Sequence, residues 1–185
     1  TAHPNAQILY LAYSAVTTCS YQSAVIASED RDYVTMLDTK QVSIGQAAIV
    51  IAIAELLQKN PHMTLSEAVS ASKALSARTR MCFLPDNLEF LKAGGRVSNA
   101  VCLGSRILHI HPCIEIHGKL VATKKYRGKM KKIARQLILD YIEDYNLDRS
   151  ILWFVRTVGL SDDIRIIAEE TAKECGFQKI QWLQA

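Results

Sequence analysis

The first third of the chain alternates between short apolar segments and helical segments, and this alternation constrains the fold more than any other feature. The pattern predicts strands at residues 7–13 and 33–37, each followed by a helix, at residues 20–28 and 43–59. Parallel strands need a crossover connection, so alternating strands and helices are typical of a parallel sheet. The helix at 43–59 is apolar nearly all round, which predicts burial on several sides.

The remainder of the chain has a different pattern. A capping box at Thr64 predicts a helix to about residue 77. A short strand at 80–84, a helix from Leu88 and a hairpin at 107–123 are expected next. A helix at 128–145, a strand at 151–157, a helix at 162–175 and a strand at 178–183 follow. We therefore predict an α/β protein of two lobes. Residues 1–79 form a partial parallel βα lobe with connecting helices, and residues 80–185 form a mixed or antiparallel α+β lobe.

Composition narrows the class of protein. The chain has 185 residues, 49% of them apolar, which is enough to bury a substantial core. No apolar run reaches the 18 or so residues that a membrane-spanning helix needs. The five cysteines are scattered and odd in number, with no CxxC pair. This pattern favours reduced thiols in the cytoplasm over a disulfide framework.

Basic residues are concentrated in one segment. Residues 124–135 hold seven lysines and arginines and no acid, so the rest of a chain of net charge +4 carries 4 − 7 = −3. Such a run suits a nucleic acid, a membrane surface or an acidic protein partner, or it is a solvated helix face. Only Tyr126 accompanies it, and no helix-turn-helix or zinc signature is present, which disfavours nucleic acid.

Two segments are candidates for binding an anion. The loop 14–20 joins the end of a strand to the start of a helix, where hydroxyls and backbone N–H groups gather. The alternative is N-capping by Thr18 or Ser20, which the residues alone favour. Arg96 follows Gly94 and Gly95 on a tight turn, and its forked donors suit a carboxylate or a phosphate.

The sequence also contains a pattern of residues that could ligate a metal ion. Alternating polar residues predict one strand face, formed by His109, His111, Cys113, Glu115 and His117. Ligands two residues apart on a strand lie about 6.5–7 Å apart, so at most a pair would share one ion, and we predict no metal. The chain has no Walker loop, GxGxxG or GxSxG motif, so no cofactor and no catalytic constellation are predicted.

Five segments resemble the DegV family of bacterial fatty-acid-binding proteins, and the resemblance covers roughly residues 7–185. They are SYQSA at 20–24, DTKQVSIG at 38–45, LEFLKAGGRVS at 88–98, PCIEIHGKL at 112–120 and KKYRGK at 124–129. The resemblance implies a cytoplasmic, non-enzymatic carrier of phospholipid metabolism. It would bind a long-chain fatty acid between two lobes, with no other cofactor. It would present the carboxylate to a partner fatty-acid kinase that forms an acyl phosphate.

The resemblance also implies roles for individual residues. The ligand would meet Ser14, Thr18, Ser20, Arg96 and Ser98, although Ser98 equally suits capping of the helix that follows it. The kinase would meet Lys124, Lys125, Arg127 and Lys129, and transient contact with a membrane surface is a further use of these lysines.

This chain departs from the family pattern at two positions, because Ala15 replaces a serine and Cys19 a glycine. If that serine is the main carboxylate donor, this protein has lost one hydrogen bond to its ligand. Family members are longer at both ends, so we expect a central fragment. The alternatives are a phosphotransferase-like enzyme of related fold and a basic regulatory module that binds nucleic acid.

Overall fold

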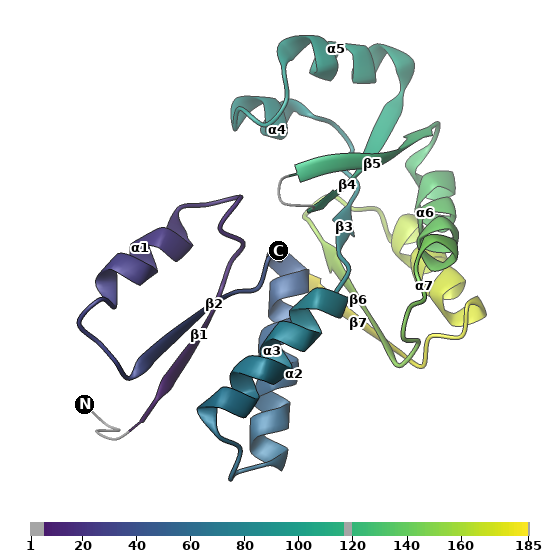
Figure 1. Ribbon diagram of the computed structural model, residues 1–185. Coiled ribbons are helices and arrows are strands. Elements are labelled where there is room, and N and C mark those ends of the chain that lie inside the picture. The colour runs from purple at the N-terminus through teal and green to yellow at the C-terminus, as the bar shows by residue number, and fades with distance from the viewer. Residues whose placement is uncertain (1–5, 117–119, 185) are drawn as a thin grey trace. The chain divides into compact units, whose positions relative to one another are not determined.

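The computed structural model describes residues 6–116 and 120–184, and these divide into two compact units. The first unit runs to Met81 and also takes in Ile116 and Leu120; the second comprises Cys82–Glu115 and Val121 onward. The chain therefore passes between the units after Met81, after Glu115 and before Val121. Figure 1 labels the elements of both units.

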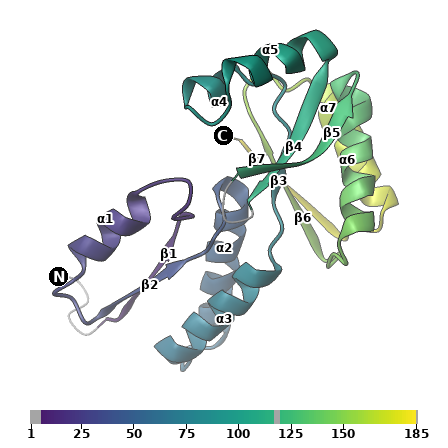
Figure 2. The same ribbon diagram turned by 45° about the horizontal axis from the view of Figure 1, so that its top comes forward.

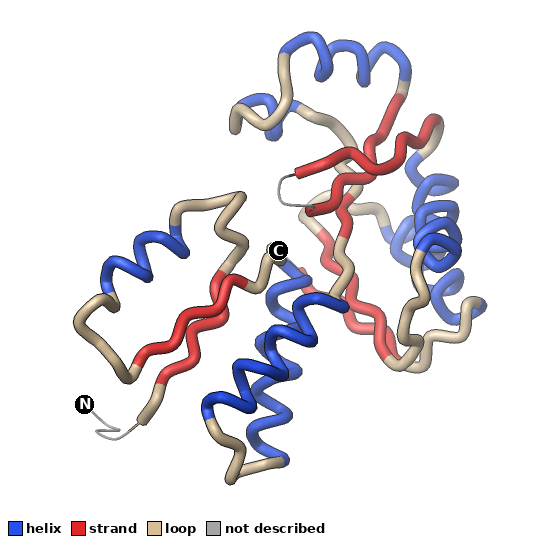
Figure 3. Tube along the Cα trace, in the orientation of Figure 1, coloured by secondary structure: helices blue, strands red, loops and turns tan. Residues whose placement is uncertain are grey.

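Among the residues that the structure describes, the first unit contains a two-stranded parallel sheet and three helices. Strands β1 (Ile8–Ala12) and β2 (Val34–Asp38) pair in parallel from Ile8↔Val34 to Ala12↔Asp38. Helix α1 (Ser20–Ala27) supplies the crossover between them (Figure 3). Helices α2 (Ser43–Lys59) and α3 (Leu65–Arg78) pack on each other, and both contact β1. The parallel βα arrangement predicted for this part of the chain is confirmed.

Helix α2 is less buried within its unit than its composition predicts. Only Gly45, Ile49 and Ile53 are buried, whereas Val50, Ile51 and Leu57 are 37–41% exposed. The prediction of burial on several sides is therefore wrong for the described residues. The reason is that the partners of α2 within the unit, α3 and β1, cover only part of its circumference.

The second unit contains two sheets and four helices among the described residues. Strands β3 (Cys82–Phe83), β4 (Ile110–Ile116) and β5 (Leu120–Arg127) form one sheet in that order, and β3 is antiparallel to β4. Strands β6 (Ile151–Arg156) and β7 (Lys179–Gln184) form a parallel pair. Helices α6 (Met130–Asp144) and α7 (Asp162–Glu174) lie side by side (Figure 2). Under α6, a small core gathers around Cys113, Tyr126 and Ile133.

Helices α4 (Glu89–Ala93) and α5 (Asn99–Leu108) precede the β4–β5 hairpin. The start predicted for this hairpin, at residue 107, is wrong. Helix α5 includes residues 107 and 108, and the strand begins at Ile110 after His109, whose φ is 50°. None of the described helices is long and apolar enough to cross a bilayer.

Candidate functional site

The first candidate site lies where β1 and β2 end, because parallel strands direct their carboxyl ends to the same edge of a sheet. Ser14 follows β1 there, and its backbone N–H donates to the Gln41 carbonyl over 3.0 Å. Ser14 is 1% exposed, and its hydroxyl has no hydrogen-bond partner among the described residues. An unpaired buried hydroxyl costs about 1–3 kcal/mol, so it needs an explanation. A polar group of a ligand that pairs with the Ser14 hydroxyl is one such explanation.

The loop after β2 holds this edge in place. The fully buried Thr39 donates its hydroxyl to the Ala12 carbonyl over 2.7 Å. The Asp38 carboxylate accepts the backbone N–H groups of Lys40 at 2.8 Å and Ala15 at 3.3 Å, which ties the two loops together. Lys40 and Ser43 adopt left-handed backbone conformations with φ of 55° and 45°. Such conformations are unfavourable outside glycine and gather at binding sites.

Thr18 and Ser20 lie at the start of α1 and interact with each other. Their hydroxyl oxygens are 2.9 Å apart, and the Thr18 hydroxyl accepts the Ser20 backbone N–H at 3.3 Å. The N-cap position belongs to Cys19, which makes no side-chain capping bond. The Thr18 hydroxyl therefore accepts the N–H of Ser20, the first residue of α1, whereas an N-cap side chain usually accepts the N–H of the second or third helical residue. The capping predicted for Thr18 or Ser20 is present only in this altered form. Ala15 and Cys19 are exposed.

Arg96 and Ser98 lie in the second unit, on the turn between α4 and α5. The Arg96 backbone N–H donates to the Leu91 carbonyl over 2.8 Å, and its guanidinium donates to the Gly94 carbonyl. Gly95 has φ of +72°, a conformation that glycine adopts without strain. The Ser98 hydroxyl accepts the Val101 N–H at 3.3 Å, so Ser98 caps α5. Because Ser14, Thr18 and Ser20 belong to the first unit, a shared clamp with Arg96 stays a prediction.

The basic segment forms a groove of about 830 Å³ on the second unit, lined by residues of β5, α6 and α7. Its cations are Arg127, Lys129, Lys131, Lys132 and Arg135, and its apolar residues include Ile133, Leu139 and Ile167. Lys131 pairs with Asp163 at 3.5 Å and Arg135 with Glu174 at 2.8 Å. Arg127, Lys129 and Lys132 have no acidic partner in the described part of the chain.

Lys124 faces a different environment from the other cations of this segment. Its ammonium lies 2.7 Å from the Asp144 carboxylate and 3.7 Å from that of Asp140. The hydrogen bond with Asp144 raises the pKa of Lys124. Lys125 is exposed on β5 and is not among the residues that line the groove. Of the four residues predicted to meet a partner, the structure brings Arg127 and Lys129 into the groove.

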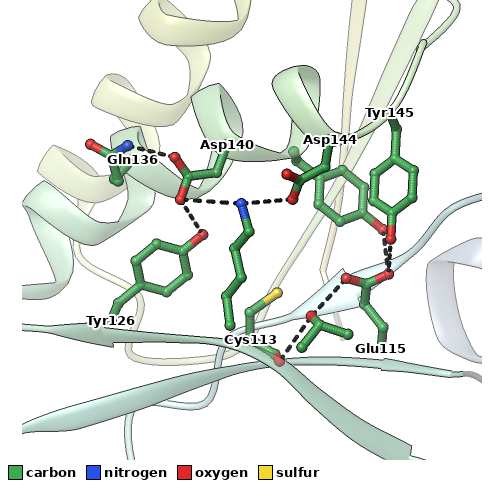
Figure 4. A network of polar contacts seen from close by, with 10 residues as sticks. Cys113, Glu115, Tyr126, Gln136, Asp140, Asp144 and Tyr145 are labelled. Atoms are coloured by element: carbon green, nitrogen blue, oxygen red, sulfur yellow. Dashed lines mark hydrogen bonds and ion pairs between the residues drawn. The ribbon is translucent and has the colours of Figure 1, made fainter.

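Besides the basic groove, the second unit contains a cluster of polar side chains around a buried carboxylate, which Figure 4 shows. Glu115 is 5% exposed and accepts hydroxyls from Thr123 at 2.8 Å, Tyr145 at 2.9 Å and Tyr141 at 3.4 Å. Alongside it, the Tyr126 hydroxyl donates to Asp140 over 2.9 Å. Burial raises the pKa values of Tyr126 and Tyr141 well above the ordinary tyrosine range, so both stay protonated donors.

The sequence predicted a helix at 128–145 but did not indicate this cluster. The available signal was a pair of tyrosines four residues apart, which places both hydroxyls on one helix face. The strand face with alternating His, Cys and Glu residues does not extend as the sequence suggested. Glu115 accepts hydroxyls, His109 lies outside the strand, and His117 lies outside the described residues. Within residues 6–116 and 120–184, no three His, Cys, Asp or Glu side chains are grouped to hold a metal ion.

Comparison with known proteins decides the family. Residues 3–181 match the model of a family described as "Uncharacterised protein, DegV family". The chain belongs to the DegV family. A DegV domain-containing protein of Streptococcus pyogenes serotype M3 is 29% identical over 183 residues, covering 94% of this chain and 63% of that protein. One from Lactococcus lactis is 29% identical over 151 residues, covering 77% of this chain and 51% of that protein. The chain thus spans less than two thirds of these relatives.

Solved structures show the same fold. A DegV family protein from Thermus thermophilus, described for its fatty acid binding, superimposes with a TM-score of 0.79 at 24% identity over 99% of this chain and 65% of that chain. A DegV family protein from Eubacterium eligens loaded with heptadecanoic acid gives a TM-score of 0.82 at 19% identity, over 98% and 67%. At these identities the likeness establishes the two-part α/β architecture of the DegV fold.

Proposed function

We propose that this DegV-family chain binds a long-chain fatty acid and holds its carboxylate at the edge where β1 and β2 end. The observation that carries the proposal is the buried, unpaired hydroxyl of Ser14. A carboxylate oxygen is a strong acceptor for such a donor, and hydrogen bonds to charged groups contribute about 1.5–3 kcal/mol. Family members described as carrying fatty acids support the same ligand class.

The energetics of such a ligand place most of the binding free energy in its acyl tail. Burial of an acyl chain contributes about 0.8 kcal/mol per CH₂, so affinity comes mainly from the tail. The head group then needs orientation more than strength, which suits the few donors at this edge. Ala15 offers no hydroxyl, and its N–H already donates to Asp38. Ser14 is therefore the main side-chain donor of the loop in this proposal, with Thr18 and Ser20 as further donors at the start of α1 and Arg96 as a separate candidate counter-charge.

The basic groove supports a second part of the proposal. We infer that Arg127 and Lys129 dock a partner fatty-acid kinase, to which this carrier presents the carboxylate for conversion to an acyl phosphate. The nucleotide chemistry then belongs to the partner, which agrees with the absence of a phosphate-binding sequence motif in this chain. Lys124, which is paired with Asp144, contributes little to docking.

The test is the lipid content of the purified protein. Organic extracts of the wild type and of Ser14→Ala, Arg96→Ala and Ser76→Ala are compared by mass spectrometry. Ser76→Ala is a matched control, because it too removes a buried serine hydroxyl without a partner, from α3 of the same unit. We expect stoichiometric fatty acid in the wild type and in Ser76→Ala, and in Ser14→Ala a Kd for fatty acid that is roughly tenfold or more higher, which lowers the amount of lipid retained through purification.

Thermal unfolding separates a lost contact from a lost fold. The unliganded Ser14→Ala protein should melt at or above the wild-type temperature, because no protein partner loses a hydrogen bond. Equal lipid in Ser14→Ala and Ser76→Ala would remove Ser14 from the head-group site. Absence of fatty acid from every sample, including wild type supplied with fatty acid, would refute the carrier assignment.

A further inference from the structure

The side chain of Gln41 connects the edge where β1 and β2 end with the end of helix α3. Its carboxamide nitrogen donates to the Thr79 carbonyl over 3.2 Å, across 38 positions of the sequence. Thr79 is the residue at the C-terminal end of α3. Gln41 is only 8% exposed, and glutamine is mostly found at protein surfaces, so the burial of this side chain needs a reason.

The backbone of Gln41 makes the contacts that reach the proposed head-group site. Its carbonyl accepts the Ser14 N–H at 3.0 Å, and its own N–H donates to the hydroxyl of the fully buried Thr39 over 3.3 Å. Ser14 is thus bonded through its backbone to Gln41, and Gln41 is bonded through its side chain to the end of α3. A displacement of Gln41 would therefore displace Ser14.

Gly45 leaves the room that the Gln41 side chain needs. This glycine is buried in the first turn of α2. A Cβ added there would lie 2.8 Å from Gln41 Oε1 and 3.0 Å from the Cβ of Met81, closer than non-bonded atoms normally approach. The Gln41 carboxamide is therefore confined between the start of α2 and the chain that follows α3, and a glycine permits this close approach.

We propose that Gln41 is a positioning residue of the head-group site, and that its side chain holds Ser14 where the Ser14 hydroxyl can donate to a carboxylate. This role rests on the proposed function, because it concerns the same fatty acid and the same donor. Gln41 acts through Ser14 and does not itself touch the ligand. Loops move more readily than strands, and a hydrogen bond weakens steeply when its angle is poor, so a donor on a loop needs such an anchor.

The test measures how strongly the protein prefers an acid to an alcohol of the same chain length. Delipidated wild type and variants are incubated with phosphatidylcholine vesicles that contain equal amounts of hexadecanoic acid and hexadecanol. The protein is re-isolated, and the ratio of bound acid to bound alcohol is measured by mass spectrometry. The two ligands share the same tail, so a weaker fold or a weaker tail site lowers both and leaves the ratio unchanged. Only a change at the head group alters the ratio.

The variants separate positioning from stability. Gln41→Met keeps a flexible side chain of similar size and removes the hydrogen bond to Thr79. Gln41→Ala gives a second reading if a methionine is not accommodated there. Gln46→Met is the matched control, because Gln46 also donates its carboxamide to a backbone carbonyl, that of Leu11 within β1, over 2.9 Å. Ser14→Ala is the reference for a lost head-group donor.

We expect Gln41→Met to lower the ratio of acid to alcohol at least about threefold, because a misplaced donor loses part of a hydrogen bond to a charged group. Ser14→Ala should lower the ratio further, and Gln46→Met should keep the wild-type ratio.

The outcomes distinguish this role from the proposed function. A wild-type ratio in both Gln41 variants, together with a lowered ratio in Ser14→Ala, would overturn the role of Gln41 and leave the head-group site standing. An equal decrease in Gln46→Met would also overturn it, because the effect would then come from a general loosening of the unit. An unchanged ratio in Ser14→Ala would remove the head-group site itself, and with it the role of Gln41.

Discussion

Glu115 illustrates how a single buried carboxylate organises its surroundings. It is almost fully removed from water, yet hydroxyls from β5 and from the end of α6 point at its two oxygens. A carboxyl group that accepts several hydrogen bonds is tolerated inside a protein, whereas a buried one without partners would be strongly destabilising. The cluster therefore fastens the C-terminal half of α6 to the β4–β5 hairpin.

The contribution of each tyrosine to this cluster can be measured separately. We expect Tyr145→Phe to lower the free energy of unfolding by about 1–3 kcal/mol, because it removes a 2.9 Å hydrogen bond to a buried carboxyl oxygen. Tyr141→Phe should cost less, because its contact is 3.4 Å long. Urea denaturation of both variants tests the order. The exposed Tyr33→Phe is the control, and equal stabilities for all three would show that Glu115 draws its support from elsewhere.

Helix α3 shows how local sequence determines an element. The Thr64 hydroxyl accepts the Glu67 N–H, and the Glu67 carboxylate accepts the Thr64 N–H at 2.8 Å, so the predicted capping box is confirmed. The hydrogen bond from the Thr64 backbone lowers the pKa of Glu67 below its ordinary value of 4.5, and the Thr64 hydroxyl adds to this.

This shift predicts how the stability of the first unit depends on pH. A carboxyl whose pKa is lower in the folded state stabilises the fold above its unfolded pKa, and the benefit disappears as pH falls through the folded pKa. Wild type should therefore exceed Glu67→Gln in unfolding free energy by a constant amount above pH 4.5, and the difference should shrink below it. Denaturation at several pH values measures this difference. A gap independent of pH would mean that charge has no part in the cap.

Elements that depend on local sequence signals are predicted well, whereas features that depend on contacts with residues far away in the sequence are not. The bounds of α2 and the cap of α3 agree with the structure, because apolar runs and capping residues act over a few positions. The helix expected after Ser98 is present as α5, but its last residues, 107 and 108, were predicted as strand, because they suit a strand as well as a helix.

The same distinction between local signals and long-range contacts applies to the residues of the candidate sites. The loop that contains Ser14 was predicted from its place after a strand. Its position in the fold depends on Gln41, whose carbonyl accepts the Ser14 N–H from more than twenty positions away. Glu115 likewise meets Tyr145 across thirty positions, and no local pattern indicates such a pairing.

At the scale of the whole molecule, fold and function are separable. DegV structures only 19–24% identical to this chain share its architecture, so most of the sequence is free to vary while the fold persists. What distinguishes one member from another is then the set of groups at its sites. In this chain, the edge with Ser14 and the basic groove lie in different units, so ligand binding and partner docking should respond to different substitutions.

If the two sites are independent, a change in the groove should affect docking and not the bound ligand. Reversal of two groove charges, in the double variant Arg127→Glu, Lys129→Glu, should leave bound fatty acid unchanged. It should reduce acyl-phosphate formation by the partner kinase by at least about tenfold, because carboxylates then replace the two cations that we propose to dock the kinase. The wild-type rate should itself fall as salt is raised, since exposed charges are screened.

Lys179→Glu makes one similar charge change on the exposed start of β7, away from the residues that line the groove, and serves as the control. If the double variant and Lys179→Glu support equal rates, the groove is not the docking surface. If the double variant instead loses its fatty acid, Arg127 and Lys129 act on the ligand, and the separation of the two sites fails.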